Sequence, residues 1–266
     1  MRSIPNPVHT HHQGAPAHHP ENKMPILGRD LAKDTEILLD SSLAIVGRPG
    51  SGATLTAIRM ATAYLSSGHS VLFLDRTGDL RKHHAALGQP LTEPTASLRP
   101  EDPSPARPIS AALDRLTAAP SHEYLDLQGA SLDDMDHVSR DVSHWLCLNY
   151  RSGIRPRHRI MLVMDHFSPE MTPDFLHIME LARDYFHLVL TMTDTDWLAP
   201  ENIIIRSNMR QRLFLSTSQP LLNAEIGNFV SFSGGQTTKT SPANIDLKEG
   251  TGWCSGSFGH SVICLS

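Results

Sequence analysis

The stretch LAIVGRPGSGAT, residues 43–54, decides the fold of this chain. It starts with a short apolar run that ends in glycine, which is typical of a buried strand, and apolar residues then recur at helical spacing as far as Leu65. Gly68 follows as a helix stop, before a second apolar run, VLFLD at 71–75. Residues 43–75 therefore predict a strand, a loop, a helix and a second strand, in that order.

The loop between the first strand and the helix has the spacing G-x-x-x-x-G-K-[ST] at every fixed position except the lysine. Glycines let the backbone curl and direct successive N–H groups at a phosphate, and the helix adds its positive N-terminal end. We expect the Thr54 hydroxyl to bind Mg²⁺. The alternative is a glycine-rich turn without a ligand. The predicted phosphate-binding residues are Gly47, Arg48, Pro49, Gly50, Ser51, Gly52, Ala53 and Thr54.

Ala53 occupies the position of the lysine that neutralises the β- and γ-phosphates in such loops. Its loss predicts weaker ATP binding and a still larger loss of turnover. Arg48 lies in the same loop and is a candidate for partial substitution, unless the turn directs its side chain to solvent.

A second functional pattern is RIMLVMDH, residues 159–166, an apolar strand that ends in an aspartate. This is the Walker B pattern, in which the carboxylate, here Asp165, holds Mg²⁺ directly or through water. Many such ATPases continue with a glutamate that polarises the attacking water. This chain has His166, which can act as a base near neutral pH. The alternative is a buried strand that ends at a polar edge. We therefore predict Thr54 and Asp165 as metal ligands, and Asp165 and His166 as catalytic residues.

Further strands and helices alternate along the chain. This predicts a three-layer α/β fold with a mainly parallel central sheet. Residues 1–24 are rich in proline and histidine and are expected to be disordered, with adventitious metal binding as the alternative. Residues 88–108 read as a proline-rich linker, and residues from about 109 to 150 as two helices. Strands are predicted near 37–39, 159–165, 187–192, 211–215 and 244–266, and helices or turns at 172–184, 199–207 and 219–228.

Composition excludes several classes of protein. The chain has 266 residues, 39% of them hydrophobic, which is enough for one large domain. It has no apolar window long enough to span a bilayer and no apolar core of a secretory signal, so we expect a cytoplasmic protein. Three cysteines cannot form a paired framework and are expected to be reduced thiols. The net charge of −5 disfavours tight nucleic-acid binding by a single chain.

Taken together, the motifs resemble the FtsK/HerA superfamily of RecA-like P-loop motors. Its branches include DNA translocases, the coupling proteins of conjugation and type IV secretion, and the EccC/EssC ATPases of type VII secretion. The segments that carry the resemblance are ILGRD at 26–30, GRPGSGAT, LDRTGDL at 74–80, RIMLVMDH, LARDYFHLVLT at 181–191 and NMRQRLFL at 208–215. The resemblance covers about residues 25–266 and implies a RecA-like P-loop domain with a small helical insertion at about 109–150. It implies ATP and Mg²⁺ as cofactors, although the loss of either stays open.

The departures from the family motifs all predict weaker catalysis. The loop lysine, the Walker B glutamate and the sensor glutamine after Thr191 are all replaced by residues that perform the chemistry less well. Arg183, Arg210 and Arg212 are candidates for an arginine finger, with Arg212 preferred.

The resemblance thus implies a nucleotide-binding, motor-type module of a DNA-transfer or secretion apparatus with reduced or no hydrolysis. The alternatives are a catalytically dead scaffold subunit and an active DNA-translocating or DNA-packaging ATPase that uses Arg48. The implied partners are a secretion or conjugation ATPase and DNA, with weak self-association. The implied place is the cytoplasm, at the periphery of a membrane machine.

Overall fold

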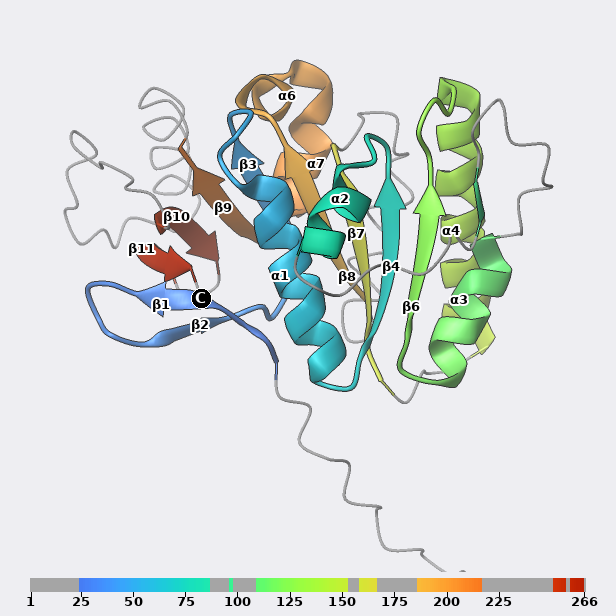
Figure 1. The fold of residues 1–266 in the computed structure, drawn as a ribbon, viewed down its shortest axis with the longest axis horizontal. Coiled ribbons are helices and arrows are strands. Elements are labelled where there is room, and N and C mark those ends of the chain that lie inside the picture. Colours follow the sequence, from blue (N-terminus) through green and yellow to red (C-terminus); the bar gives the residue numbers. More distant parts are fainter. Residues whose placement is uncertain are drawn as a thin grey trace, which may run out of the picture.

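The computed structural model of the chain describes residues 24–86, 96–97, 109–152, 158–166, 186–216, 251–256 and 259–265. These residues form one mixed sheet with helices on both faces (Figure 1). The strands are β1 (Ile26–Asp30), β2 (Glu36–Leu38), β3 (Leu43–Gly47), β4 (Ser70–Asp75), β5 (Ala96–Ser97), β6 (His122–Asp126), β7 (Ile160–Asp165), β8 (Phe186–Met192), β9 (Gln211–Leu215), β10 (Thr251–Gly256) and β11 (Gly259–Leu265). The helices are α1 (Ala53–Ser66), α2 (Asp79–Ala86), α3 (Ile109–Ala118), α4 (Leu132–Ser152), α6 (Asp194–Leu198), α7 (Ile203–Asn208) and the 3-10 turn η1 (Pro200–Asn202).

The sheet has the strand order β2-β1-β11-β10-β9-β3-β8-β7-β4-β6-β5. From β9 to β5 every neighbouring pair is parallel, and the remaining pairs are antiparallel. The central strands β3, β4, β7 and β8 are buried along their whole length. This matches their continuous apolar sequences, because parallel strands covered on both faces need no polar side. The predicted α/β class with a mainly parallel sheet is confirmed.

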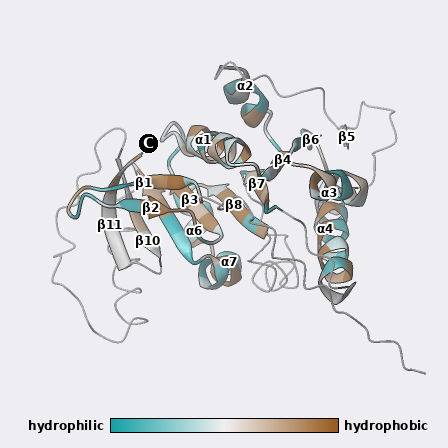
Figure 2. Ribbon diagram, turned by 90° about the horizontal axis from the view of Figure 1, so that it is seen from below, coloured by the Kyte–Doolittle hydropathy of each residue, from teal (hydrophilic) through white to brown (hydrophobic). Residues whose placement is uncertain are grey.

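Strand β3 shows how the sheet divides the core into two layers. Leu43 and Ile45 belong to a buried cluster with α1 and α2, whereas Ala44 and Val46 belong to a second cluster with α3, α4, α6 and α7. The alternation follows from the two-residue period of a strand. Figure 2 shows α1 and α2 on one side of the sheet and α4 and α7 on the other. The three layers predicted from sequence are therefore present.

Strand β6 was not predicted, although the helices on either side of it were. It pairs in parallel with β4, in the register Phe73↔Tyr124. Its sequence, HEYLD, lacks the apolar run by which the other parallel strands were recognised. The polar side chains have partners that only the fold supplies. Glu123 accepts two hydrogen bonds from Arg115, with N–O distances of 2.6 and 3.0 Å, and the Tyr124 hydroxyl donates to Asp75.

Most other predicted elements within the described residues are present. The strands predicted near 37–39 and at 159–165, 187–192 and 211–215 correspond to β2, β7, β8 and β9, and the closing strands to β10 and β11. Helix α6 was not predicted separately from the turn region that follows it. The tail up to residue 23, the predicted helices at 172–184 and 219–228, and all but residues 96–97 of the predicted linker lie outside the described residues. None of the helices in the described ranges is long and apolar enough to cross a membrane.

Candidate functional site

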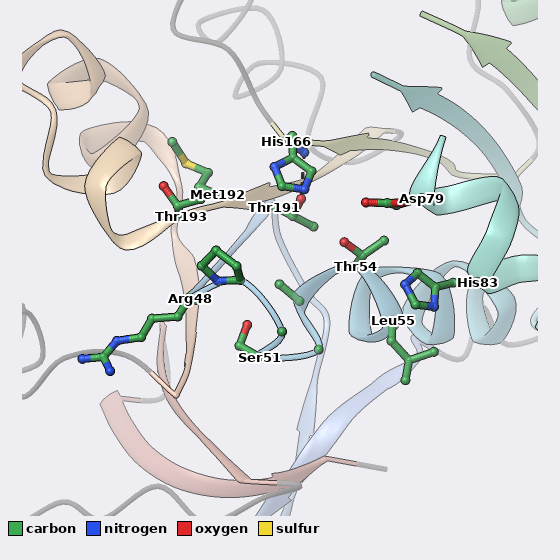
Figure 3. Close-up of a pocket in the computed structure, with 15 residues that line it drawn as sticks. Arg48, Ser51, Thr54, Leu55, Asp79, His83, His166, Thr191, Met192 and Thr193 are labelled. Carbon is green, nitrogen blue, oxygen red and sulfur yellow. Dashed lines mark hydrogen bonds between the residues drawn. The ribbon is translucent and has the colours of Figure 1, made fainter. Parts of the chain in front are cut away.

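A cleft of about 370 Å³ lies at the carboxyl ends of β3, β7 and β8. It is lined by the loop after β3, the first turn of α1, two residues of α2, the residue after β7 and the residues at the end of β8 (Figure 3). All eight predicted phosphate-binding residues from Gly47 to Thr54 line it, as does His166. The structure thus brings together two motifs that are more than a hundred residues apart in sequence.

The loop after β3 has the tight curl expected of a phosphate cradle. Gly50 and Gly52 have φ angles of 82° and 87°, in the left-handed region that glycine adopts without steric cost. A Cβ atom on Gly47 would lie 2.2 Å from the Ser51 Oγ, so the close approach there requires glycine. Helix α1 begins directly after Gly52, and its free N–H groups therefore face the cleft.

Ser51 provides an independent indication that the curl is built for a polar ligand. Its Oγ is buried and has no hydrogen-bond partner among the described residues. A buried hydroxyl without a partner costs free energy, which a phosphate oxygen accepting its proton would recover. The orphaned hydroxyl and the glycine cradle both fit the phosphate group that the motif implies.

Asp165 is the centre of a hydrogen-bond network below the loop. Its side chain is fully buried, and its Oδ1 accepts hydrogen bonds from Thr54 Oγ1 at 3.0 Å and from Thr191 Oγ1 at 2.6 Å. Its Oδ2 accepts a longer hydrogen bond from Thr77 Oγ1, at 3.3 Å. The predicted pair Thr54 and Asp165 is therefore in direct contact. Hydroxyl and carboxylate oxygens of this kind fit Mg²⁺, which prefers oxygen ligands.

His166 follows β7 with a left-handed backbone, at a φ of 51°. Its backbone N–H donates to Thr191 Oγ1 at 2.9 Å, and this bond holds the turn against the end of β8. Its imidazole Nε2 lies 3.9 Å from Asp165 Oδ2, and its side chain is 46% exposed. The residue that replaces the expected glutamate is therefore in the cleft and accessible.

Asp79 is a cleft residue that the sequence analysis did not select, although it lies inside the quoted segment LDRTGDL. The buried Asp75 carboxylate places it, because it accepts hydrogen bonds from Gly78 N at 2.8 Å and Arg81 N at 3.2 Å and so fixes the turn into α2. A hydrogen bond from the Lys82 ammonium lowers the pKa of Asp79 and favours its charged form. Thr77 and Thr191, which contact Asp165, were likewise not predicted as site residues.

Arg48 points away from the cleft. Its guanidinium is directed outward (Figure 3), where its Nε lies 3.7 Å from Asp194 Oδ2. Among the described residues that line the cleft, Arg48 is the only arginine or lysine. The suggestion that its charge replaces the missing loop lysine is therefore not supported by this geometry, because the guanidinium is directed toward Asp194.

Arg212 lies outside the cleft and is held within its own part of the chain. Its Nε donates to Met209 O at 3.2 Å, and its guanidinium carbon lies 5.6 Å from the centre of the Trp197 ring. Arg210 is exposed at the start of β9, and Arg183 lies outside the described residues. The structure thus brings Thr54, Asp165 and His166 together and places Arg212 elsewhere.

The sequence matches no protein-family model and no curated protein. The structure is similar to VirB4 of Thermoanaerobacter pseudethanolicus, with a TM-score of 0.54, 13% sequence identity, and coverage of 93% of this chain and 97% of that one. It is also similar to the bacterial conjugative coupling protein TrwB in a form named deltaN70, with a TM-score of 0.54, 13% identity, and coverage of 93% and 90%. The cytoplasmic domain of EssC gives a TM-score of 0.48 and 12% identity over 93% of this chain and 43% of that one. At these identities the comparisons establish a shared fold, and the P-loop ATPase type of fold that the motifs implied is confirmed.

Proposed function

We propose that this chain is a nucleotide-binding, motor-type module of a DNA-transfer or secretion apparatus, with reduced or no hydrolysis. One observation carries the proposal. The phosphate cradle is complete in its backbone and its Thr54–Asp165 contact, yet Ala53 leaves it without a lysine. The fold shared with a conjugative coupling protein supports the choice of apparatus.

Binding would rest on backbone groups and hydroxyls. The N–H groups at the start of α1 and the Ser51 hydroxyl would donate to phosphate oxygens, and Thr54 and Asp165 would hold Mg²⁺. The cation would supply the positive charge that offsets the phosphates. Because the Asp79 carboxylate lines the cleft and the buried Asp165 carboxylate lies close to it, nucleotide without a cation would be repelled. We therefore expect ATP binding to be weak and strongly dependent on a divalent cation.

Reduced hydrolysis follows from the groups that face the cleft. The transferring phosphoryl group develops charge that a loop lysine normally stabilises, and Arg48 is directed toward Asp194 instead. His166 stands at the end of β7 and can accept a proton from water, but only as a neutral imidazole. The chain retains more of what binding needs than of what turnover needs.

The proposals on partners, location and the role of Arg212 are more specific than the main proposal, and they rest on the family resemblance. They comprise a partner ATPase of a secretion or conjugation machine, DNA as a second partner, a peripheral position at a membrane, and Arg212 as a finger toward a neighbouring nucleotide. Its contacts with Trp197 and Met209 would have to be exchanged for a phosphate before Arg212 could act in this way.

Calorimetric titration of the full chain with ATP, with and without Mg²⁺, tests the proposal when paired with an assay of phosphate release. Binding that requires Mg²⁺ and is not followed by turnover is the expected result. Absence of binding would favour the dead scaffold subunit. Sustained turnover would favour the active DNA-translocating ATPase. Asp165→Asn serves as the matched site variant, because it keeps the shape of the side chain and removes its charge.

A further inference from the structure

We infer that Asp79, Asp165 and His166 together form a site for a divalent first-row transition cation, bound through two carboxylates and one imidazole. The inference deepens the proposed function, because the cation would lie in the nucleotide cleft. It differs from the Mg²⁺ arrangement of Thr54 and Asp165, because it adds a nitrogen ligand and a carboxylate from α2. It also predicts that the cation binds when no nucleotide is present.

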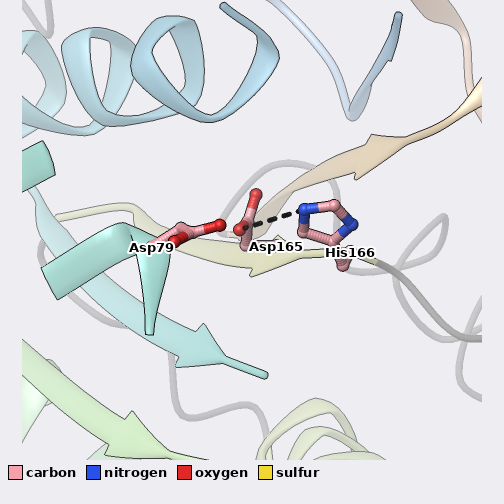
Figure 4. Close-up of side chains that lie close together, drawn as sticks. All are labelled: Asp79, Asp165 and His166. Atoms are coloured by element: carbon pink, nitrogen blue, oxygen red, sulfur yellow. Dashed lines mark ion pairs between the residues drawn. The ribbon is translucent and has the colours of Figure 1, made fainter. Parts of the chain in front are cut away.

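The three donor groups come from different elements and converge on one point. Asp79 is the first residue of α2, Asp165 ends β7, and His166 follows it. One donor atom from each lies within 4.8 Å of the other two. Figure 4 shows the Asp165 carboxylate between the Asp79 carboxylate and the His166 ring. Metal–ligand bonds of about 2.1 Å put donor atoms roughly 3–4 Å apart, so the set closes around a cation with small side-chain movements.

Two features orient these donors. The Oδ1 of Asp165 accepts hydrogen bonds from Thr54 and Thr191. Among the described residues, its Oδ2 accepts only the longer bond from Thr77, and it lies 3.9 Å from His166 Nε2. On the other side, the Asp75 carboxylate fixes the turn that carries Asp79. Asp75 is therefore a positioning residue for this site. The Oδ2 edge of Asp165 and the turn before α2 bring the donor atoms close together.

The charge of the site calls for a cation. Asp79 lines a cleft whose loop lacks its lysine, and the buried Asp165 lies close to Asp79. Lys82 contacts Asp79 Oδ1 at 3.0 Å, but this pair is exposed and therefore contributes little to stability. A divalent ion bound between the carboxylates would offset both charges and present a positive centre to phosphate.

The imidazole sets the class of cation. Mg²⁺ prefers an octahedral shell of oxygens and gives up its water reluctantly, whereas imidazole nitrogen suits the first-row transition metals. Replacement of the expected glutamate by His166 therefore shifts the site away from Mg²⁺. Mn²⁺ is the most suitable probe, because it accepts both carboxylate and imidazole and is paramagnetic.

The experiment measures Mn²⁺ binding to the full chain without nucleotide, by electron paramagnetic resonance of the free ion. The tail histidines are replaced by alanine in every protein compared, so that they contribute no background; they are His9, His11, His12, His18 and His19. We expect one Mn²⁺ site, and pulsed spectra that show coupling to a directly bound nitrogen-14. His166→Gln should abolish that coupling and weaken Mn²⁺ binding at least tenfold, and Asp79→Asn should weaken it by a similar factor.

His137→Gln is the matched control, because His137 is an exposed histidine on α4 next to Arg140. It should keep both the affinity and the nitrogen coupling. Absence of Mn²⁺ binding, binding without nitrogen coupling, or an unchanged affinity in His166→Gln would each overturn the inference. Titration of the same proteins with ATP and excess Mg²⁺ separates the two proposals. If the protein binds ATP but does not bind Mn²⁺ at this site, only this inference is refuted. If it binds Mn²⁺ but not ATP, only the proposed function is refuted.

Discussion

Restoring the missing loop lysine gives the sharpest test of the cleft. Ala53 is the first residue of α1 and lines the cleft beside Thr54, so the side chain of Ala53→Lys would enter the space where phosphate is expected. A charge-assisted hydrogen bond to phosphate contributes about 1.5–3 kcal/mol, which corresponds to an about 10- to 150-fold lower Kd for ATP. The carboxylates of Asp79 and Asp165 would compete for the new ammonium in the free protein. We therefore expect a result near the lower end, about tenfold.

The same substitution should slightly destabilise the fold. A cation in the first turn of α1 opposes the helix dipole, at a cost of about 0.3–1 kcal/mol. Isothermal titration with MgATP gives the affinity, and urea unfolding confirms that the variant is folded. Ala53→Gln controls for side-chain length, and Ala118→Lys adds the same charge at the exposed end of α3. An unchanged Kd in folded Ala53→Lys, or an equal gain in Ala118→Lys, would refute the assignment of the loop.

Four further predictions concern Arg48, His187, Arg212 and the oligomeric state. Arg48→Ala should change ATP affinity by less than about twofold in calorimetry, because its guanidinium pairs with Asp194, and a tenfold loss would instead support the active-motor alternative. Burial lowers the pKa of His187 to about 3 in the folded protein, whereas an unfolded histidine has a pKa of about 6.5. Below about pH 6.5 the unfolded state therefore binds a proton that the folded state does not bind, and the protein should lose stability as the pH falls. His187→Leu should remove about 2 kcal/mol of the loss between pH 7.5 and pH 5.0 in urea unfolding, and an unaltered pH dependence would contradict this origin. Arg212→Ala should lower the free energy of unfolding by about 1 kcal/mol through the lost contact with Trp197, and wild-type stability would show that the contact contributes nothing. The purified chain should be mainly monomeric by light scattering with or without ATP, because weak nucleotide binding adds little free energy to subunit association. A stable hexamer would contradict this prediction.

The core of the fold was predictable because the central parallel strands are continuous apolar runs. LAIVG in β3 and IMLVMD in β7 are buried at every position, so their sequences carry the signal directly. Strand β6 was not predictable in this way. Its Glu123 is matched by Arg115 and its Tyr124 by Asp75, and such partners are invisible until the chain is folded.

The same distinction applies to the candidate site, where some residues were predictable from local sequence and others depend on distant partners. Thr54 and Asp165 were predicted because Asp165 ends one recognisable strand and Thr54 belongs to the glycine-rich loop motif after another, and the carboxyl ends of parallel strands meet at one edge of a sheet. Asp79 depends on the turn that Asp75 fixes, and the direction of Arg48 depends on Asp194, far away in the sequence. Local patterns identify which residues end a strand, whereas the direction of a side chain is set by partners from elsewhere in the chain.

The antiparallel end of the sheet has a consequence for how the protein is made. Strand β1 lies between β2 and β11, so β1 gains its second neighbour only after β11, far later in the sequence, has left the ribosome. A two-stranded hairpin is marginally stable in water, and contacts between distant segments are slow to form. One edge of the β1–β2 hairpin therefore stays unpaired until β11 is available. Until β1 and β11 join, that edge of the nascent chain is open to wrong pairing.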